Sequence, residues 1–357
     1  MRSLLLILLA ATTLTMSLRA QTTDGAAWIL LYHHVSNTTP EATSVTPARF
    51  DEHLDFLARN DYRVVALSEV IARLSSGELD SRSVAITFDD AYKSIYTEAF
   101  PRLRERGWPF TIFVNTDAVD RNSNAYVSWT ELREMEQAGA SVGNHSRRHA
   151  HLAAHRVDES SQQWRARVSA DIVYAQQRLA AELTRPLQLF AYPYGEFTPE
   201  LKALVRDLGY RAFGQQSGPV GRGVAELAIP RIPIARAFAD LASLGEKLRT
   251  RHLPVRVLQP ASPVLQPIAV APTLELQIAA GPFDLSQLAC YVSNQGRAQL
   301  SFRADQPRVV RVKAAHALPV GRSKYTCTAP ATNAPGVYYW YSHLWLQPKP
   351  DGSWYDE

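Results

Sequence analysis

Short apolar runs alternate with amphipathic stretches along the first two thirds of the chain. The runs are rich in β-branched and aromatic residues and predict buried strands, whereas apolar residues three or four positions apart predict helices between them. Strands that alternate with helices favour a parallel sheet with the helices outside it, and we expect this sheet to form a barrel. The predicted strands cover residues 28–32, 62–65, 83–88, 110–115, 140–144, 187–192 and 210–214.

Capping residues mark several of the helices that the pattern predicts. Thr46 precedes Pro47, which is a favourable combination of N-cap and first helical position. Ser128 begins a capping-box pattern, and Gly107 and Gly139 are stop signals. One helix is expected to begin at residue 47, and another is expected to end at residue 106. Further helices are expected over residues 67–74, 128–139, 157–183, 199–208 and 238–249.

Polar residues follow the carboxyl ends of four predicted strands. His33, Asp89, His145 and Tyr194 each come within a few residues of such an end. The carboxyl ends of parallel barrel strands lie on one face, which is where enzymes of this architecture place their active sites. We therefore expect these side chains to gather at one site.

The pattern changes after residue 253. Five prolines stiffen residues 254–272, which we interpret as a linker. Short β-like runs separated by turn residues fill residues 273–357 and predict a small all-β domain, an immunoglobulin-like sandwich. Its strands are expected at residues 274–278, 289–292, 309–312, 324–328 and 337–346.

A dense set of aromatic residues lies near the end of this second domain. Exposed aromatic rings stack on sugars, which favours a glycan contact through the C-terminal domain. The competing interpretation is that alternate residues fill the core of the sandwich. The set consists of Tyr338, Tyr339, Trp340, Tyr341, Trp345, Trp354 and Tyr355.

The first twenty residues have the layout of a secretory signal peptide. Arg2 precedes an apolar run over residues 4–11, and small and polar residues then lead to Ala20. We expect residues 1–20 to be removed, the protein to be periplasmic or extracellular, and the mature form to have no stable membrane span. An uncleaved N-terminal anchor is the alternative.

Charge and cysteine content narrow the class of protein further. The formal net charge is +4, and Arg2 and Arg19 contribute two of these charges, which leaves +2 for the rest. So small an excess does not favour a nucleic-acid partner. Cys290 and Cys327 form an even count, which suggests a disulfide in an exported protein, with two buried thiols as the alternative.

Two pairs of residues have the chemistry of a metal site. Asp89 and Asp90 are adjacent carboxylates at a strand end, so one can bind a metal ion while the other accepts a proton. His145 and His149 are four positions apart and would face the same way in a helical turn, as two ligands of one ion do. Taken singly, a solvated turn and ordinary surface histidines explain these residues as well.

Three motifs together resemble the NodB-like polysaccharide deacetylases, carbohydrate esterase family 4, over residues 28–250. The run TFDD at residues 87–90 resembles the first motif of that family. The run HSRRH at residues 145–149 resembles the second, and PY at residues 193–194 resembles the end of the third. The resemblance implies a distorted (β/α) barrel of the polysaccharide deacetylase type as a catalytic domain at residues 21–253.

The chain departs from the common pattern of that family in four places. Ala191 stands where the third motif has Arg, Ala91 stands where Gly follows the paired Asp, and the Trp-bearing and Leu-x-His motifs are missing. A circularly permuted subgroup, the biofilm poly-N-acetylglucosamine deacetylases, explains most of these departures, because its His motif lies near the N-terminus. The run LYHHV at residues 31–35 is similar to that motif and makes His33 the catalytic histidine, with His34 as its positional rival.

The resemblance also implies a role for each matching residue. Asp90, His145 and His149 would hold a divalent metal ion, for which zinc is favoured and cobalt and nickel are alternatives. Asp89 would act as the general base and His33 as the general acid in the hydrolysis of an N-acetyl group.

The substrate side is less fully specified by these motifs. Pro193 and Tyr194 would contact the substrate, with a backbone N–H near Tyr194 at the oxyanion. We place Arg231 on the same side and name it as the candidate to replace the missing Arg as the partner of Asp89, with an ordinary surface Arg as the alternative. The expected substrate is an N-acetylglucosamine polysaccharide, with poly-N-acetylglucosamine favoured and peptidoglycan, chitin-like oligomers or another exopolysaccharide as alternatives.

Two other functions compete with this interpretation. An inactive or weakly active protein of the same fold that binds glycans is favoured by the missing Arg and disfavoured by the complete metal set. A peptidase is disfavoured because the chain contains neither an H-E-x-x-H nor a G-x-S-x-G motif.

Overall fold

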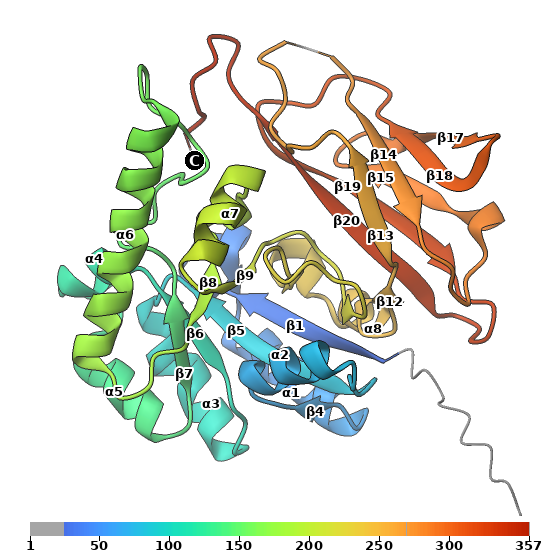
Figure 1. The fold of residues 1–357 in the computed structure, drawn as a ribbon. Coiled ribbons are helices and arrows are strands. Elements are labelled where there is room, and N and C mark those ends of the chain that lie inside the picture. The colour runs from blue at the N-terminus through green and yellow to red at the C-terminus, as the bar shows by residue number, and fades with distance from the viewer. Residues whose placement is uncertain (1–24, 269, 357) are drawn as a thin grey trace, which may run out of the picture.

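The computed structural model describes residues 25–268 and 270–356, and Figure 1 shows that they form two parts. An α/β part contains the blue to yellow elements, and a β-rich part contains the orange and red ones. The expected signal peptide at residues 1–20 lies outside the described residues. Among the residues described, no helix combines the length and the apolar character that a membrane crossing needs.

A nine-stranded sheet forms the centre of the α/β part. Its strands are β1 (Ala26–Tyr32), β4 (Arg63–Val64), β5 (Ser83–Asp89), β6 (Thr111–Val114), β7 (Ser141–Asn144), β8 (Leu189–Ala191), β9 (Arg211–Phe213), β10 (Val220–Gly221) and β11 (Ile232–Pro233). The order is β10-β1-β5-β6-β7-β8-β9, with β4 beside β5 and β11 beside β1. Every pair is parallel except β1 with β10, so the predicted parallel sheet is confirmed.

Helices follow most of these strands and cover the sheet (Figure 1). They are α1 (Pro47–Arg59), α2 (Leu67–Ser76), α3 (Phe100–Glu105), α4 (Thr116–Asp120), α5 (Trp129–Gln137), α6 (Ser161–Glu182), α7 (Pro199–Asp207) and α8 (Leu241–Lys247). The predicted caps are confirmed, because Thr46 accepts a hydrogen bond from the backbone N–H of Arg49 and Ser128 forms a capping box with Glu131. Shorter turns are η1 (Glu41–Thr43), η2 (Ile95–Ala99), η3 (Pro193–Gly195), η4 (Arg236–Ala239) and η5 (Leu285–Gln287).

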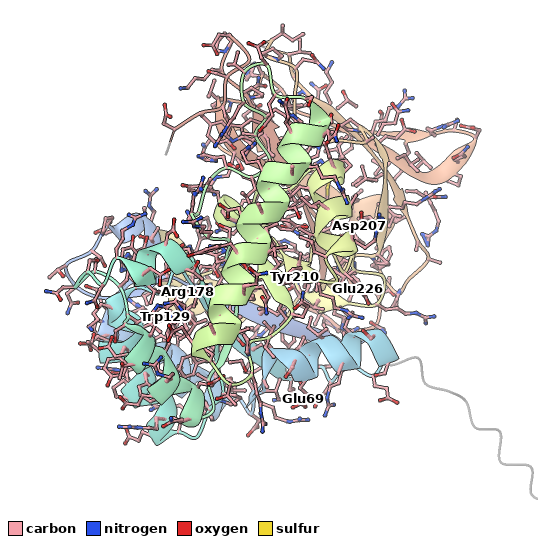
Figure 2. The ribbon with its side chains drawn as sticks, turned by 60° about the vertical axis from the view of Figure 1, so that its left-hand side comes forward. Glu69, Trp129, Arg178, Asp207, Tyr210 and Glu226 are labelled. Carbon is pink, nitrogen blue, oxygen red and sulfur yellow. A yellow bond between two sulfur atoms is a disulfide. The ribbon has the colours of Figure 1, made fainter. Side chains whose placement is uncertain are left out.

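The helix expected over residues 238–249 is the short turn η4 followed by α8, and two other helices differ from the prediction for local reasons. The helix expected up to residue 106 is the π-helical turn η2 followed by α3, and Pro101 at the junction has no N–H to donate. Helix α6 begins after Ser160, whose side chain caps it, rather than at residue 157. Figure 2 shows Arg178 of α6 beside Trp129 of α5, where the guanidinium lies 4.8 Å from the ring centroid and ties the two helices together.

The sheet is curled into a half-barrel rather than flat. Its path is open between β10 and β9, but residues 229–233 run between the two ends. Ile229 pairs with Phe213 of β9, and Ile232 pairs with Leu30 of β1. This segment carries Arg231 into the centre of the curl, and the α/β fold of the prediction is confirmed in this half-barrel form.

Two sheets make up the β-rich part. The five-stranded sheet has the order β12-β20-β19-β15-β16, and the four-stranded sheet has the order β13-β14-β18-β17. Side chains from both sheets share one apolar core, among them Leu276 of β14 and Tyr325 of β19. The strands are β12 (Arg251–His252), β13 (Val255–Gln259), β14 (Thr273–Ile278), β15 (Ala289–Val292), β16 (Gly296–Arg297), β17 (Gln299–Arg303), β18 (Gln306–Lys313), β19 (Gly321–Pro330) and β20 (Tyr338–Gln347).

This part differs from the prediction at its beginning. Residues 254–272 were expected to be a linker, but β13 lies among them and pairs with β14, because an extended proline-rich segment can still supply an edge strand. The two-sheet arrangement agrees with a sandwich, and the immunoglobulin-like form stays a prediction. Two further short strands, β2 (His34–Val35) and β3 (Ser44–Val45), pair with each other in a separate two-stranded sheet.

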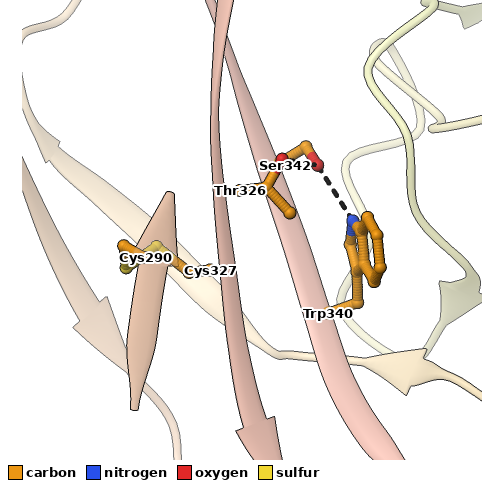
Figure 3. Close-up of a disulfide and its surroundings, with 5 residues drawn as sticks. All are labelled: Cys290, Thr326, Cys327, Trp340 and Ser342. Atoms are coloured by element: carbon orange, nitrogen blue, oxygen red, sulfur yellow. Dashed lines mark hydrogen bonds between the residues drawn. A yellow bond between two sulfur atoms is a disulfide. The ribbon is translucent and has the colours of Figure 1, made fainter. Parts of the chain in front are cut away.

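The predicted disulfide is present between β15 and β19. Cys290 and Cys327 are directly opposite in the register of these strands, and Figure 3 shows the bond between them. The aromatic set divides between the two interpretations: Tyr339 and Trp345 are buried in the core, whereas Tyr338 is 48% exposed. Figure 3 also shows Trp340 donating its indole N–H to Ser342.

Candidate active site

Asp89 and Asp90 lie at the carboxyl end of β5, as the sequence predicted. Asp89 is the last residue of the strand and is fully buried, and Asp90 is nearly so. Asp90 and Ala91 both have positive φ angles, 72° and 58°, so the chain makes a left-handed turn that separates the two carboxylates. Glycine adopts positive φ angles at the lowest energetic cost. This is a physical reason for the Gly that the family pattern has at the position of Ala91.

A buried arginine holds Asp89 in place. Two terminal nitrogens of Arg231 donate hydrogen bonds of 2.7 Å, one to each carboxylate oxygen of Asp89, and both side chains are fully buried. The Nε of Arg231 also donates to the carbonyl of Gly214 at 3.0 Å. The expected placement of Arg231 on the substrate side is therefore corrected, because a fully buried guanidinium has no surface for a substrate. Its contacts are those of a partner to Asp89.

His145 and His149 come together without the helical turn that the sequence suggested. His145 follows β7, and the next residues form a bend in which Ser146 and His149 have φ angles of 66° and 55°. The hydroxyl of Ser146 accepts a hydrogen bond of 3.0 Å from the backbone N–H of His149 and stabilises this bend. The two imidazole rings end with their centroids 4.8 Å apart.

Asp90, His145 and His149 form a set that fits a metal ion. One ligand atom from each lies within 4.8 Å of the others, and Asp90 Oδ1 is 3.4 Å from His145 Nε2 and 3.2 Å from His149 Nε2. His145 Nδ1 donates to the carbonyl of Ala191 at 2.7 Å, so the neutral ring presents a lone pair at Nε2. That buried nitrogen has no hydrogen-bond partner among the described residues. A lone pair facing a carboxylate is repulsive unless a cation lies between them.

Nearby charges keep both carboxylates ionised. Burial alone would raise the pKa of Asp89, but the charges of Arg231 and His145 outweigh it and hold that pKa below its usual range. Burial would also raise the pKa of Asp90, but the nearby His145 and His149 outweigh burial and lower that pKa strongly. The site therefore concentrates negative charge, which favours a bound cation.

The two histidine ligands respond to this field in opposite directions. Burial would lower the pKa of His145, but the carboxylates of Asp89 and Asp90 outweigh it and raise that pKa. Burial dominates at His149 and lowers its pKa to about 4, against the attraction of Asp90. His149 is thus neutral near pH 7, which is the form that binds a metal.

His33 follows β1 and reaches the same site. Tyr32 of β1 is paired with Phe88 of β5, so the next residues along the chain, His33 and Asp89, lie side by side at this edge of the sheet. Burial lowers the pKa of His33, and its strongest electrostatic partners are Asp90 and then Asp89. His34 instead stacks on Tyr92, with ring centroids 3.6 Å apart. His33 is therefore better placed than its rival to act beside Asp89.

The turn η3 carries Tyr194 to the edge of the site. Tyr194 has a φ angle of 59°, and its ring lies 4.4 Å from that of His149 and 4.1 Å from that of His151, measured between centroids. Pro193 is the first residue of this turn and is buried, so its expected contact with the substrate is corrected. Stacking of this kind positions the tyrosine next to the metal-binding set.

Two residues of the site were missed by the sequence reasoning. Tyr92 lies over His34, and burial and the Asp90 carboxylate raise its pKa. Glu196 is 2% exposed and lies within 2.9 Å of His151 Nδ1. The position of Tyr92 two residues after Asp90 was a usable signal for the first, but no local pattern identifies the second.

Known proteins resemble this chain over the same part. Residues 76–213 match the protein family described as Polysaccharide deacetylase. The poly-beta-1,6-N-acetyl-D-glucosamine N-deacetylase of Staphylococcus aureus is 24% identical over 210 residues, which cover 57% of this chain and 72% of that protein. The structure of IcaB from Ammonifex degensii is 25% identical, with a TM-score of 0.56, over 63% of this chain and 97% of its own.

A third comparison concerns the fold alone. The Streptococcus pyogenes deacetylase PplD in complex with acetate is 24% identical, with a TM-score of 0.56, over 62% of this chain and 98% of its own. The fold, the carboxylate and histidine set and the matching family define a hydrolase that acts on amide bonds. Residues 76–213 of the α/β part thus match the polysaccharide deacetylases, and the fold of that part is similar to that of their solved structures.

Proposed function

We propose that this protein removes acetyl groups from an N-acetylglucosamine polysaccharide by metal-dependent hydrolysis. The observation that carries the proposal is the set of Asp90, His145 and His149 beside a second carboxylate, Asp89, that Arg231 holds ionised. Three protein ligands leave room for water at a divalent ion, as catalytic zinc sites require. The alternative, an inactive or weakly active glycan-binding protein, was favoured by the absence of Arg at position 191. The contact between Arg231 and Asp89 weakens this alternative.

The proposed reaction needs a base on one side of the acetamide. A divalent ion held by the three ligands would supply Lewis acidity, polarising an amide carbonyl and lowering the pKa of a coordinated water toward about 7. Asp89 accepts the proton of the attacking water, because Arg231 keeps its carboxylate ionised and fixes its direction. The backbone N–H near Tyr194 is the proposed donor to the developing oxyanion.

An acid must protonate the departing amine, because an unprotonated sugar amine is a poor leaving group. His33 is the proposed acid, because it lies beside Asp90 and Asp89, whose carboxylates favour its protonated form against the opposing effect of burial on its pKa. Proton transfers of this kind typically contribute about 10²–10⁴-fold to a rate.

Further details of the function are proposals of the same kind. Poly-N-acetylglucosamine is the favoured substrate, because the motif at residues 31–35 and the staphylococcal relative both indicate that polymer. Zinc is the favoured ion, since two imidazoles and a carboxylate are a common zinc set, and cobalt and nickel also suit it. We propose residues 1–20 as a signal peptide for export and residues 21–253 as the catalytic domain.

Acetate release by the purified protein from N-acetylglucosamine oligomers tests the function directly. We expect release to stop when a chelator is added and to return with zinc, cobalt or nickel. Folded protein that releases no acetate with any of these ions would contradict the proposal.

Two variants test the separate roles of the adjacent residues. Asp89→Asn should retain bound metal but lose at least about 10²-fold in acetate release, because it removes the base and not a ligand. His145→Ala should lose both metal and activity. Metal content measured beside turnover distinguishes the two, and normal turnover in Asp89→Asn would refute its role.

A further inference from the structure

A groove lies between the active-site turn and the C-terminal domain. It has a volume of about 730 Å³, and its walls come from both parts of the chain. Tyr194 and Pro233 belong to the catalytic side, and Arg322, Lys324 and Lys349 belong to the C-terminal side. A volume of this size falls within the range of ligand sites, roughly 300–1,000 Å³.

The groove begins at the proposed catalytic site. Tyr194, which lines it, has its ring 4.4 Å from that of His149. Pro233, on the same wall, is paired with Leu31, two residues before His33. A polymer whose reacting sugar lies at Asp89 would therefore extend its neighbouring units along this groove.

Contacts between the two parts keep the walls of the groove in position. Arg322 donates a hydrogen bond to the carbonyl oxygen of Tyr194, and its guanidinium lies 5.6 Å from the tyrosine ring centroid. The Nζ of Lys324 lies 3.5 Å from the carbonyl oxygen of Gln215. The second wall is thus attached to the catalytic turn itself.

Positive charge dominates the lining of the groove. Arg322 and Lys324 are two positions apart on β19, so their side chains leave the same face of the strand. Lys349 adds a third cation, and its partner Asp356, 2.9 Å away, is the one carboxylate among the described lining residues. Lys324 is partly buried there, which lowers its pKa to about 8, and an anion beside it would offset that cost.

We propose that this groove binds an anionic group, a carboxylate or a phosphate, on the polymer next to the sugar that is deacetylated. This proposal rests on the proposed function, but among its substrate alternatives it favours an N-acetylated polysaccharide that carries negative charge, such as peptidoglycan, over poly-N-acetylglucosamine, whose unmodified units are uncharged. It also has a consequence for the product. A deacetylated unit carries an ammonium group, and the cations of the groove repel it.

Direct binding of anionic probes to the full chain tests this proposal. The probes are a galacturonate oligomer, which carries carboxylates, and a glycerol phosphate oligomer, with a glucosamine oligomer as the cationic comparison. We expect calorimetry to detect binding of at least one anionic probe at low ionic strength and no binding of the glucosamine oligomer. Which anionic probe binds identifies the source of the charge.

The matched variants are Lys324→Gln combined with Lys349→Gln, and Lys313→Gln as the control. Lys313 is exposed on β18, in the other sheet, and does not line the groove. We expect the double variant to bind the anionic probe about tenfold more weakly and the control to bind it normally. Raising the salt concentration from about 50 to about 500 mM should weaken binding to the unmodified protein as well.

The outcomes separate this proposal from the proposed function. Equal binding by the unmodified protein and the double variant, or no binding of either anionic probe at low salt, overturns the groove as an anion site. Absence of acetate release from every oligomer overturns the deacetylase function instead, and calorimetry still decides whether the groove binds anions.

Discussion

Arg231 is 142 positions from Asp89 in the sequence, yet the two side chains form the tightest charged pair of the proposed site. Both are fully buried, so each depends on the other to offset the cost of leaving water. Removing one partner of such a pair typically destabilises a protein by about 3–5 kcal/mol. The pair therefore links the stability of the α/β part to the ionisation of the proposed base.

Arg231→Lys keeps the positive charge but loses the two parallel hydrogen bonds to Asp89. We expect kcat for acetate release to fall about 10- to 100-fold with little change in KM, because a misdirected base affects the reaction more than binding. Steady-state kinetics check this, with the exposed Arg206→Lys as the control. A kcat within about twofold of the unmodified protein would show that Arg231 does not orient Asp89.

At the scale of the element, the turn η3 depends on the end of the chain. Glu196, which follows this turn, accepts hydrogen bonds from the hydroxyl of Tyr355 at 2.6 Å and the indole N–H of Trp354 at 3.2 Å. Its second oxygen also lies 2.9 Å from His151, which stacks on Tyr194. Figure 1 shows the red C-terminal end returning to the α/β part beside α6.

Tyr355→Phe removes one hydrogen bond to the buried carboxylate of Glu196. We expect the free energy of unfolding to fall by about 1–3 kcal/mol, because a buried charged acceptor loses its donor. We also expect a severalfold loss of kcat/KM, since the Tyr194 turn is held less firmly. Denaturant unfolding and acetate release measure the two effects, and the exposed Tyr338→Phe is the control. Unchanged values for both would mean that the tail does not support the turn.

At the scale of the whole molecule, the β-rich C-terminal part has its own apolar core and supplies a wall of the groove. The disulfide between Cys290 and Cys327 closes a loop with a sequence separation of 37 residues inside this domain. In the chain-entropy treatment, closing such a loop stabilises the folded state by about 3–4 kcal/mol. The domain keeps its fold, and hence the position of Arg322 and Lys324, partly through this bond.

Reduction of the disulfide should lower the free energy of unfolding of the C-terminal domain by about 3–4 kcal/mol. Its denaturant midpoint should therefore shift to a lower denaturant concentration. The chain has only these two cysteines, so a reductant acts on this bond alone. The variant with Cys290→Ala and Cys327→Ala is the control and should show the lower midpoint without responding to reductant. An unmodified protein with the same midpoint before and after complete reduction would contradict the expectation.

Much of the fold could be predicted because its signals are local. The apolar run at residues 83–88 and the capping residues Thr46 and Ser128 act within a few positions of themselves, and the structure confirms all three. Local signals were less reliable where geometry changes within a few residues. His145 and His149 were expected on a helical turn, and the left-handed φ angles of Ser146 and His149 place them on a bend instead.

Local sequence patterns indicate which residues follow the strand ends and which chemistry they offer, because strand periodicity and side-chain type are local properties. Folding of the whole chain is needed to bring Arg231 against Asp89, to bring Tyr355 against Glu196, and to place cations of the β-rich part at the turn that contains Tyr194. These contacts join positions more than one hundred residues apart. They arise from the curl of the sheet and the docking of two domains, which no short pattern encodes.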